Sequence, residues 1–286
     1  MTHPSTSRGV RIWATLALAT VTSLATWVLT RPSPVVPPPM QAMNILLPAD
    51  HNIVEAALSP DGTRLVYTAI ANGRVQLFLR SFDTFRVEPL PGTENATQPF
   101  FSPDGDRVGF FSSGFLRWVA FDGSDPVDVT PVSGETAGAA WGPRGQIVFA
   151  PLGGRGLLRV SADPDHNETD PTVTPITELD EEAGEVSHGW PVLLPDEASI
   201  VFTVGREDLD PRLAWMALEL EKRELLAPVD GSAYYLDSGH LVYARRGEIF
   251  AMPIDSSEQE GTGPARLVTS GVASSAVGYE RLGRSS

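Results

Sequence analysis

The sequence contains no cysteine among its 286 residues. Without thiols the chain has no disulfide framework, no thiolate metal site and no cysteine nucleophile. The absence leaves the compartment open, because a fold held together by its sheets needs no disulfides for stability.

Positive charge is also scarce. The chain has 21 Lys and Arg residues against 36 Asp and Glu, which gives a formal net charge of −15. Every acidic residue follows Met40, whereas Arg8, Arg11 and Arg31 precede it. Nucleic acids and anionic lipid surfaces are both bound through a basic footprint. We therefore expect no nucleic-acid partner, and no docking of the acidic part on an anionic membrane surface.

Catalytic motifs are missing as well. The sequence has no His-Arg-Asp loop or Asp-Phe-Gly motif of a protein kinase, no G-x-S-x-G nucleophile elbow and no H-E-x-x-H zinc motif. The glycine-rich stretch at 153–156 has no phosphate-loop lysine, which favours a flexible turn. The five histidines show no paired metal-ligand spacing. We expect no enzyme activity, no cofactor and no metal ion.

One long apolar run is present, the 18 uncharged residues 12–29. Its length is near the lower limit for a membrane span, and Trp13 and Trp27 lie near its ends, where aromatic rings favour the interface. Two arginines precede the run and one follows, which predicts a cytoplasmic tail at 1–11. A cleaved signal peptide is the alternative, because Ser23-Leu24-Ala25 resembles a cleavage site. Both interpretations place the remaining chain outside the cytoplasm, in the periplasm or extracellular space.

A proline-rich linker follows at residues 30–42 and contains the run Pro37-Pro38-Pro39. Such a stretch adopts polyproline II and acts as a stiff spacer. We expect it to hold a folded domain, residues 43–275, away from the membrane.

Five segments of that domain share one pattern. Each begins with the hydrophobic end of a strand, continues with a polar turn, and ends with a short apolar strand whose last residue is aromatic. The aromatic residues are separated by 43, 39, 53 and 41 positions; they are Tyr67, Phe110, Phe149, Phe202 and Tyr243. A period near 40 with strands on both sides is typical of a four-stranded β-propeller blade. The longest spacing reflects an acidic insertion at 163–182, which we expect to be a surface loop.

The turns support this interpretation by their chemistry. In Ser-Pro-Asp-Gly, proline presets φ, the aspartate side chain bonds nearby backbone, and glycine accepts positive φ. The predicted fold is all-β, a propeller of four-stranded blades with five recognisable blades and an incomplete sixth, preceded by one transmembrane helix. The five blades are expected at about 53–91, 97–132, 137–178, 187–229 and 232–270.

These residues resemble a known repeat. The Ser-Pro-Asp-Gly turn with its apolar-aromatic strand is similar to the TolB-type, WD-like propeller repeat. Over about residues 11–275 the chain also resembles the extracytoplasmic C-terminal region of bacterial eukaryotic-like serine/threonine kinases. The stretches that carry this second resemblance begin at Leu90, Ala140, Ser187 and Gly239, and the membrane segment and linker match that family's layout.

Two departures from the family are visible in the sequence. In that family a kinase domain precedes the membrane segment, whereas ten residues precede Arg11 in this sequence. The family continues into a sixth blade, whereas this sequence diverges near Ala276, and we expect 276–286 to be a truncated tail. Asn44–Leu47 is expected to form the outer strand of that final blade. A five-bladed ring in which this strand joins the fifth blade is the alternative.

His188 and Trp190 are the best candidates for a ligand-binding surface. They begin the inner strand of the fourth predicted blade, near the central channel where propellers often bind ligands. The alternative is a structural role, with Trp190 packed between blades and His188 capping a neighbouring strand. The carboxylates of Asp180, Glu181, Glu182 and Glu185 could bind a cation, although a solvated acidic loop is favoured over a calcium site with fixed ligand spacing.

The sequence therefore predicts a non-catalytic binding module, a sensor or scaffold. By resemblance it would act in a receptor-kinase-like signalling system, with an envelope protein or small ligand as partner and a serine/threonine kinase as a further one. Two alternatives stay open. The chain could be the propeller part of a hydrolase or peptidase system, or a non-functional remnant of a split kinase gene.

Overall fold

The computed structural model describes residues 45, 47–153, 155–163, 172–196, 198–207, 209–219, 222–254 and 263–271. The expected membrane segment 12–29, the linker 30–42 and the tail 276–286 lie outside these residues. Within them no helix is long and apolar enough to cross a membrane.

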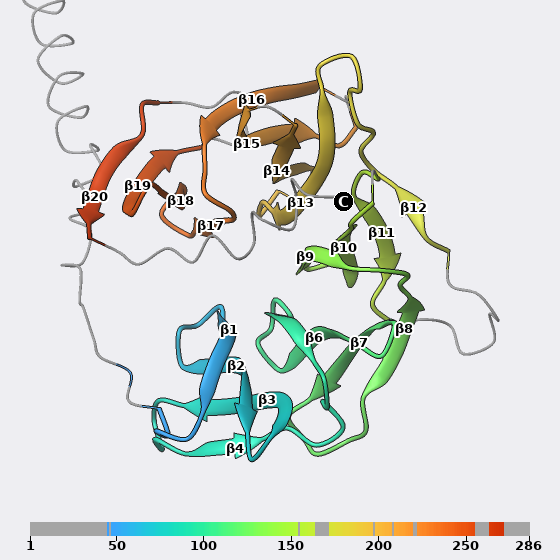
Figure 1. Cartoon of the computed structure of the whole chain (residues 1–286), viewed down its shortest axis with the longest axis vertical. Coiled ribbons are helices and arrows are strands. Elements are labelled where there is room, and N and C mark those ends of the chain that lie inside the picture. The colour runs from blue at the N-terminus through green and yellow to red at the C-terminus, as the bar shows by residue number, and fades with distance from the viewer. Residues whose placement is uncertain are drawn as a thin grey trace, which may run out of the picture. The chain divides into compact units, whose positions relative to one another are not determined.

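The described chain folds into five antiparallel sheets of four strands each, and each sheet is built from consecutive strands (Figure 1). The first sheet contains β1 (Asn52–Leu58), β2 (Arg64–Ala71), β3 (Arg74–Ser81) and β4 (Val87–Pro89), and the second contains β5 (Thr97–Phe101), β6 (Arg107–Ser112), β7 (Phe115–Ala120) and β8 (Val127–Pro131). The third contains β9 (Thr136–Trp141), β10 (Gln146–Pro151), β11 (Leu158–Ser161) and β12 (Thr174–Pro175). The fourth contains β13 (Glu185–Leu193), β14 (Ser199–Arg206), β15 (Leu209–Ala217) and β16 (Lys222–Pro228). The fifth contains β17 (Ala233–Leu236), β18 (His240–Arg245), β19 (Glu248–Pro253) and β20 (Arg266–Ser270). The prediction of five four-stranded propeller blades is confirmed.

Each blade begins with a tight hairpin between its first two strands. In the first blade the Ser59 hydroxyl donates to Asp61 Oδ1 at 2.6 Å, the Thr63 N–H donates to the same oxygen at 3.0 Å, and Gly62 has φ of 70°. The Ser59 hydroxyl, followed by the Thr63 groups, lowers the pKa of Asp61 to about 2. The aspartate is thus held as an internal acceptor that shapes the turn.

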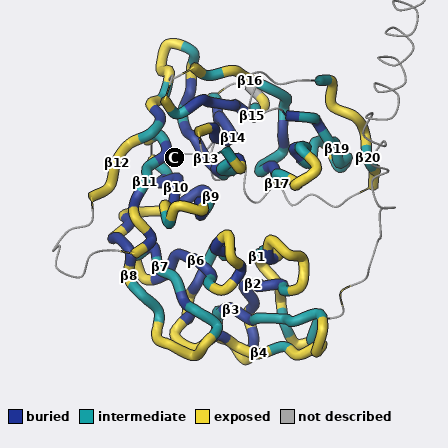
Figure 2. The backbone as a smooth tube through the Cα atoms, turned by 180° about the vertical axis from the view of Figure 1, so that it is seen from behind, coloured by how far each residue is buried: buried dark blue, intermediate teal, exposed yellow. Residues whose placement is uncertain are grey.

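The core lies between neighbouring blades. The five aromatic residues that end the repeat are all buried: Tyr67, Phe110, Phe149, Phe202 and Tyr243. Four of them pack within clusters that join strands of adjacent sheets, such as Phe110 with Val66 and Leu77 of the first blade. Tyr67 lies in a cluster whose buried members all belong to the first blade. Figure 2 shows buried residues mainly in the middle strands of the sheets, and exposed residues in the loops, the outer strands and much of β1. In the second to fifth blades this face is covered by the preceding blade, so the position is buried and aromatic in each of them.

A basic side chain links the second and third blades. The Arg107 guanidinium carbon lies 5.0 Å from the Trp118 ring centroid and 4.7 Å from that of Trp141. The same guanidinium forms an ion pair of 3.1 Å with Asp163, and the Trp118 indole N–H donates to Ala162 O at 2.8 Å. Cation–π contacts of this kind are worth about 0.5 to 2 kcal/mol, so this link adds to the apolar packing of the two sheets.

The insertion in the third blade is more than a surface loop. Thr174 and Pro175, within the expected loop 163–182, form β12 and pair with Leu158 and Arg159 of β11. A two-residue outer strand with a proline carries little hydrophobic pattern, so the sequence gives no clear signal for it.

The expected strand at Asn44–Leu47 is not found in the described residues, since neither Ile45 nor Leu47 is in a strand and β20 is the outer strand of the fifth sheet. Instead, Leu47 packs against the first blade's buried cluster, and the His51 ring lies 4.2 Å from that of Phe78, with its Nδ1 2.8 Å from the Tyr67 hydroxyl. The segment before β1 therefore covers the aromatic face of the first blade. No strand of a sixth blade occurs among the residues that the structure describes.

Candidate functional site

The first strands of all five blades line a common cavity of about 520 Å³. Each blade contributes four consecutive residues, at 55–58, 98–101, 138–141, 190–193 and 232–235. These strands, β1, β5, β9, β13 and β17, are each the first in their sheet and pair on one side only. The cavity is therefore the central channel of the propeller, bordered by strand edges.

One position of this lining is equivalent in all five blades, and we call it the channel ring: Glu55, Gln98, Gly138, Trp190 and Ser232. Each ring residue lies four positions before the first residue of the hairpin turn that follows. In the first four blades the pairing of the first two strands is irregular near this point. Gln98, Gly138 and Trp190 have φ of 51°, 85° and 44°, in the left-handed region. Bulges of this kind turn a side chain out of the sheet, here toward the channel.

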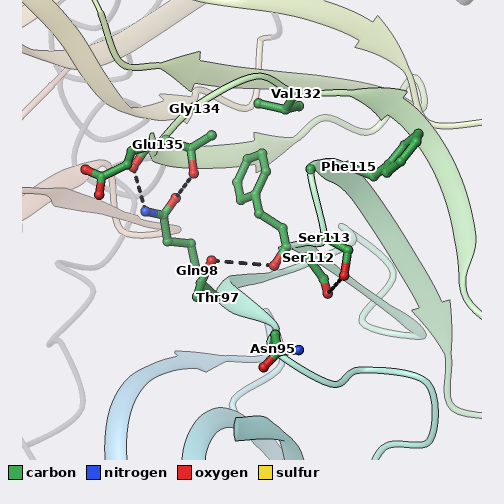
Figure 3. A pocket seen from close by; sticks show the side chains of 12 residues that line it. Asn95, Thr97, Gln98, Ser112, Ser113, Phe115, Val132, Gly134 and Glu135 are labelled. Carbon is green, nitrogen blue, oxygen red and sulfur yellow. Dashed lines mark hydrogen bonds between the residues drawn. The ribbon is translucent and has the colours of Figure 1, made fainter.

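Hydrogen bonds connect the ring from blade to blade. The Gln98 N–H donates to Glu55 Oε2 at 2.5 Å, and the Gly138 N–H donates to Gln98 Oε1 at 2.9 Å. The Gln98 amide also donates to Thr136 O at 2.7 Å and accepts from the Thr136 hydroxyl at 2.8 Å. Figure 3 shows the Gln98 side chain reaching toward the strand after Glu135. In the first two blades the ring side chain thus accepts the N–H of the next ring residue.

Glycine at the third ring position makes room for the fourth. A Cβ atom on Gly138 would lie 2.9 Å from Trp190 Cδ1 and 3.3 Å from Trp190 Cα. Trp190 is half-buried, lines the channel and packs against the cluster that joins the third and fourth blades. Of the two predicted site residues, Trp190 is therefore the one that lies in the channel wall.

His188 lies away from the channel lining, in a buried polar network between the third and fourth blades. Its side chain is fully buried, with Nδ1 2.8 Å from the Thr177 hydroxyl and Nε2 3.1 Å from Glu185 Oε2. Since the Leu157 N–H donates to the Thr177 oxygen at 2.7 Å, the hydroxyl proton is available to His188 Nδ1. With the Thr177 hydroxyl donating to Nδ1, the neutral imidazole carries its proton on Nε2 and donates it to Glu185.

Glu185 is the centre of that network. Arg223 forms an ion pair with it at 2.8 Å, and the Asp180 N–H donates to it at 2.9 Å. Burial raises the pKa of Glu185, but hydrogen bonds from His188, the Asp180 N–H and Arg223 outweigh burial and lower it to about 2. The other carboxylates of the predicted acidic loop, at Asp180, Glu181 and Glu182, are exposed. Among described residues no group of three or more His, Asp or Glu side chains could hold a metal ion.

A second, smaller hollow of about 210 Å³ lies between the second and third blades (Figure 3). Its wall is polar and includes Asn95, Ser113 and Glu135, while Ser112 donates to Glu94 O at 2.7 Å. Gln98 and Thr136 also border it. The side chain of Gln98, which links the first three residues of the channel ring, therefore also borders this hollow.

Apart from Trp190, the residues of the channel ring were missed at the level of sequence. The ring's five residues share no chemical type, so no motif marks them. The signal that could have found them is their constant offset from the turn, because equivalent positions of a repeat face the same way.

Comparison with known proteins finds similar folds among solved structures, at low sequence identity. No protein-family model matches the chain. No curated protein matches it either. Among solved structures, it is similar to TolB from Acinetobacter baumannii, with 18% identity, a TM-score of 0.57 and coverage of 76% of this chain and 56% of that one. TolB from Agrobacterium tumefaciens has 18% identity, a TM-score of 0.51 and coverage of 61% and 65%.

An oligogalacturonate lyase in complex with manganese is also similar, with 15% identity, a TM-score of 0.52 and coverage of 76% of this chain and 64% of that one. At such identities the likeness concerns the fold alone. The chain spans 56% and 65% of the length of the two TolB structures. It has a TolB-like β-propeller fold.

Proposed function

We propose that this chain is a non-catalytic binding module that recognises its ligand in the central channel. The observation that carries the proposal is the channel ring, where five blades place unlike side chains at one equivalent position around a cavity of about 520 Å³. Concave sites with a mainly apolar wall and a few placed polar groups are typical of ligand binding.

A rival proposal is an enzyme, since a lyase with manganese bound is among the similar folds. Two observations favour binding instead. The sequence has none of the nucleophile motifs named above. The described residues include no cluster of His, Asp and Glu suited to a metal ion. A fold alone does not imply chemistry.

We further propose that the module works outside the cytoplasm, tethered by residues 12–29, as the sensor or scaffold part of a receptor-kinase-like signalling system. The uncharged run with its flanking arginines, and the ordered resemblance to the extracytoplasmic region of bacterial kinases, support this setting. The expected partners are an envelope protein or small ligand, and a serine/threonine kinase.

Affinity capture from envelope extract with the full chain tests the proposal. Tyr234 lines the channel and is 62% exposed. The substitution Tyr234→Ala therefore removes contacts with the ligand and should disturb the core very little. We expect this variant to lose at least about 1 kcal/mol of binding free energy, so that the captured partner falls about fivefold or more.

Leu267→Ala is the matched control. Leu267 is 55% exposed but lies on β20, the outer strand of its blade. The Leu267→Ala variant should capture as much of the partner as the natural chain does. Equal capture by both variants would contradict recognition in the channel.

A further inference from the structure

The charges of the channel wall have one sign. Two charged residues, Glu55 and Asp237, occur among the described residues that line the cavity, and both are acidic. Glu55 belongs to the channel ring, and Asp237 lies in the turn after β17. No Lys, Arg or His is present in this described lining. Such a wall repels a carboxylate or phosphate and attracts a cation.

The Glu55 carboxylate has spare acceptor capacity. Among described residues it makes one hydrogen bond, through Oε2 to the Gln98 N–H, and it has no cationic partner. An ionised carboxylate offers about four acceptor sites on two oxygens. Glu55 is half-buried on the channel wall, so an entering ammonium or guanidinium group finds a fixed acceptor that is already oriented by the ring.

Apart from the polar side chains of Gln98 and Ser232, the rest of the wall is apolar or aromatic. Trp190, Tyr234 and Phe100 line the cavity together with alanine and proline residues. Aromatic faces attract cations, and apolar walls favour a ligand that carries hydrocarbon beside its charge. Tyr234 is 62% exposed, far more than the aromatic residues that form the cores between blades.

We infer that the channel selects an organic cation, an ammonium or guanidinium group carried on an apolar body and bound by Glu55. This inference rests on the proposed binding function of the channel and adds the class of its ligand. The cation can come from a free amine or from a lysine or arginine side chain of a partner protein. Both sources present the same chemistry to Glu55.

Titration calorimetry with the full chain tests the inference. The probes are acetyl-Phe-Lys-Phe-amide, the peptide with norleucine in place of lysine, and free 2-phenylethylamine. Because a charge-assisted hydrogen bond contributes about 1.5 to 3 kcal/mol, the lysine peptide should bind about tenfold or more tightly than the norleucine peptide. In Glu55→Gln this preference should fall to about twofold or less, since the amide oxygen still accepts the Gln98 N–H but carries no charge. Added salt should weaken binding of the lysine peptide and leave the norleucine peptide unchanged.

Glu88→Gln is the control, because it removes the same charge from an exposed residue of the outer strand β4. It should keep the full preference. Binding of the amine alone would indicate a small-molecule source, and binding of the peptide alone a protein source; either supports cation selection. Equal affinity for the lysine and norleucine peptides, or no binding of any probe, would overturn the inference. The proposed function is judged separately, by the capture experiment with Tyr234→Ala.

Discussion

Glu185→Ala should lower the free energy of unfolding by about 3 to 5 kcal/mol at neutral pH. The carboxylate is buried and joins Arg223, His188 and the Asp180 N–H. Its removal leaves a fully buried imidazole and a mostly buried guanidinium without their acceptor, and it opens a cavity between the third and fourth blades. Chemical denaturation followed by circular dichroism measures the loss.

The effect of this substitution should depend on pH. The pKa of Glu185 is lowered in the folded protein to about 2 from an ordinary value of 4.5. Its stabilising contribution is therefore complete above about pH 4.5 and is lost as the pH falls toward 2. The difference in unfolding free energy between the natural chain and Glu185→Ala should shrink across that window.

Glu182→Ala is the control for the network, because Glu182 is exposed in the same acidic loop. It should change the free energy of unfolding by less than about 0.5 kcal/mol. A loss of similar size in both variants would mean that Glu185 acts through net charge and not through its buried partners.

Gly138→Ala should cost about 2 to 4 kcal/mol of unfolding free energy and weaken binding in the channel. Two penalties add at this position. Its φ of 85° is unfavourable for any residue with a Cβ atom, and that atom would lie 2.9 Å from Trp190 Cδ1. Because Trp190 would have to move, the shape of the channel ring would change with it. Thermal or chemical unfolding measures the loss of stability. Capture of the envelope partner measures the loss of binding.

Gly145→Ala separates these two penalties. Gly145 has φ of 74° in the turn of the same blade, but an added Cβ would meet nothing within 4 Å. This variant should lose about 1 kcal/mol and keep its binding. If Gly138→Ala were no less stable than Gly145→Ala, the contact with Trp190 would not constrain the ring.

The fold could be predicted largely because its signal is repeated. Five polar turns followed by apolar-aromatic strands at a period near 40 leave few alternatives to a propeller. The aromatic positions repeat because each is buried, against the preceding blade in the second to fifth repeats and against the segment before β1 at Tyr67. Strands without such a face, such as Thr174–Pro175, gave no pattern to detect.

The site could be predicted only in part. His188 and Trp190 are two residues apart in one strand, yet the bulge between Gly189 and Val192 gives them different surroundings. Trp190 enters the channel wall, while His188 bonds to Thr177 and Glu185 between the blades. Sequence spacing assumes a regular strand, and a bulge breaks that assumption. Glu55 and Gln98 were missed for a different reason, because their roles arise from contacts between blades.

The measurement that tests the central claim most directly is site-specific photo-crosslinking in the native envelope. A photoreactive phenylalanine analogue is placed at Tyr234 in the channel or at Leu267 on the outer strand, two exposed positions of the same blade. If the channel is the recognition surface, light should produce a covalent adduct from position 234, none from position 267, and less adduct from position 234 when Glu55→Gln is added. Adducts from position 267 alone would contradict the account and place recognition on the rim of the propeller.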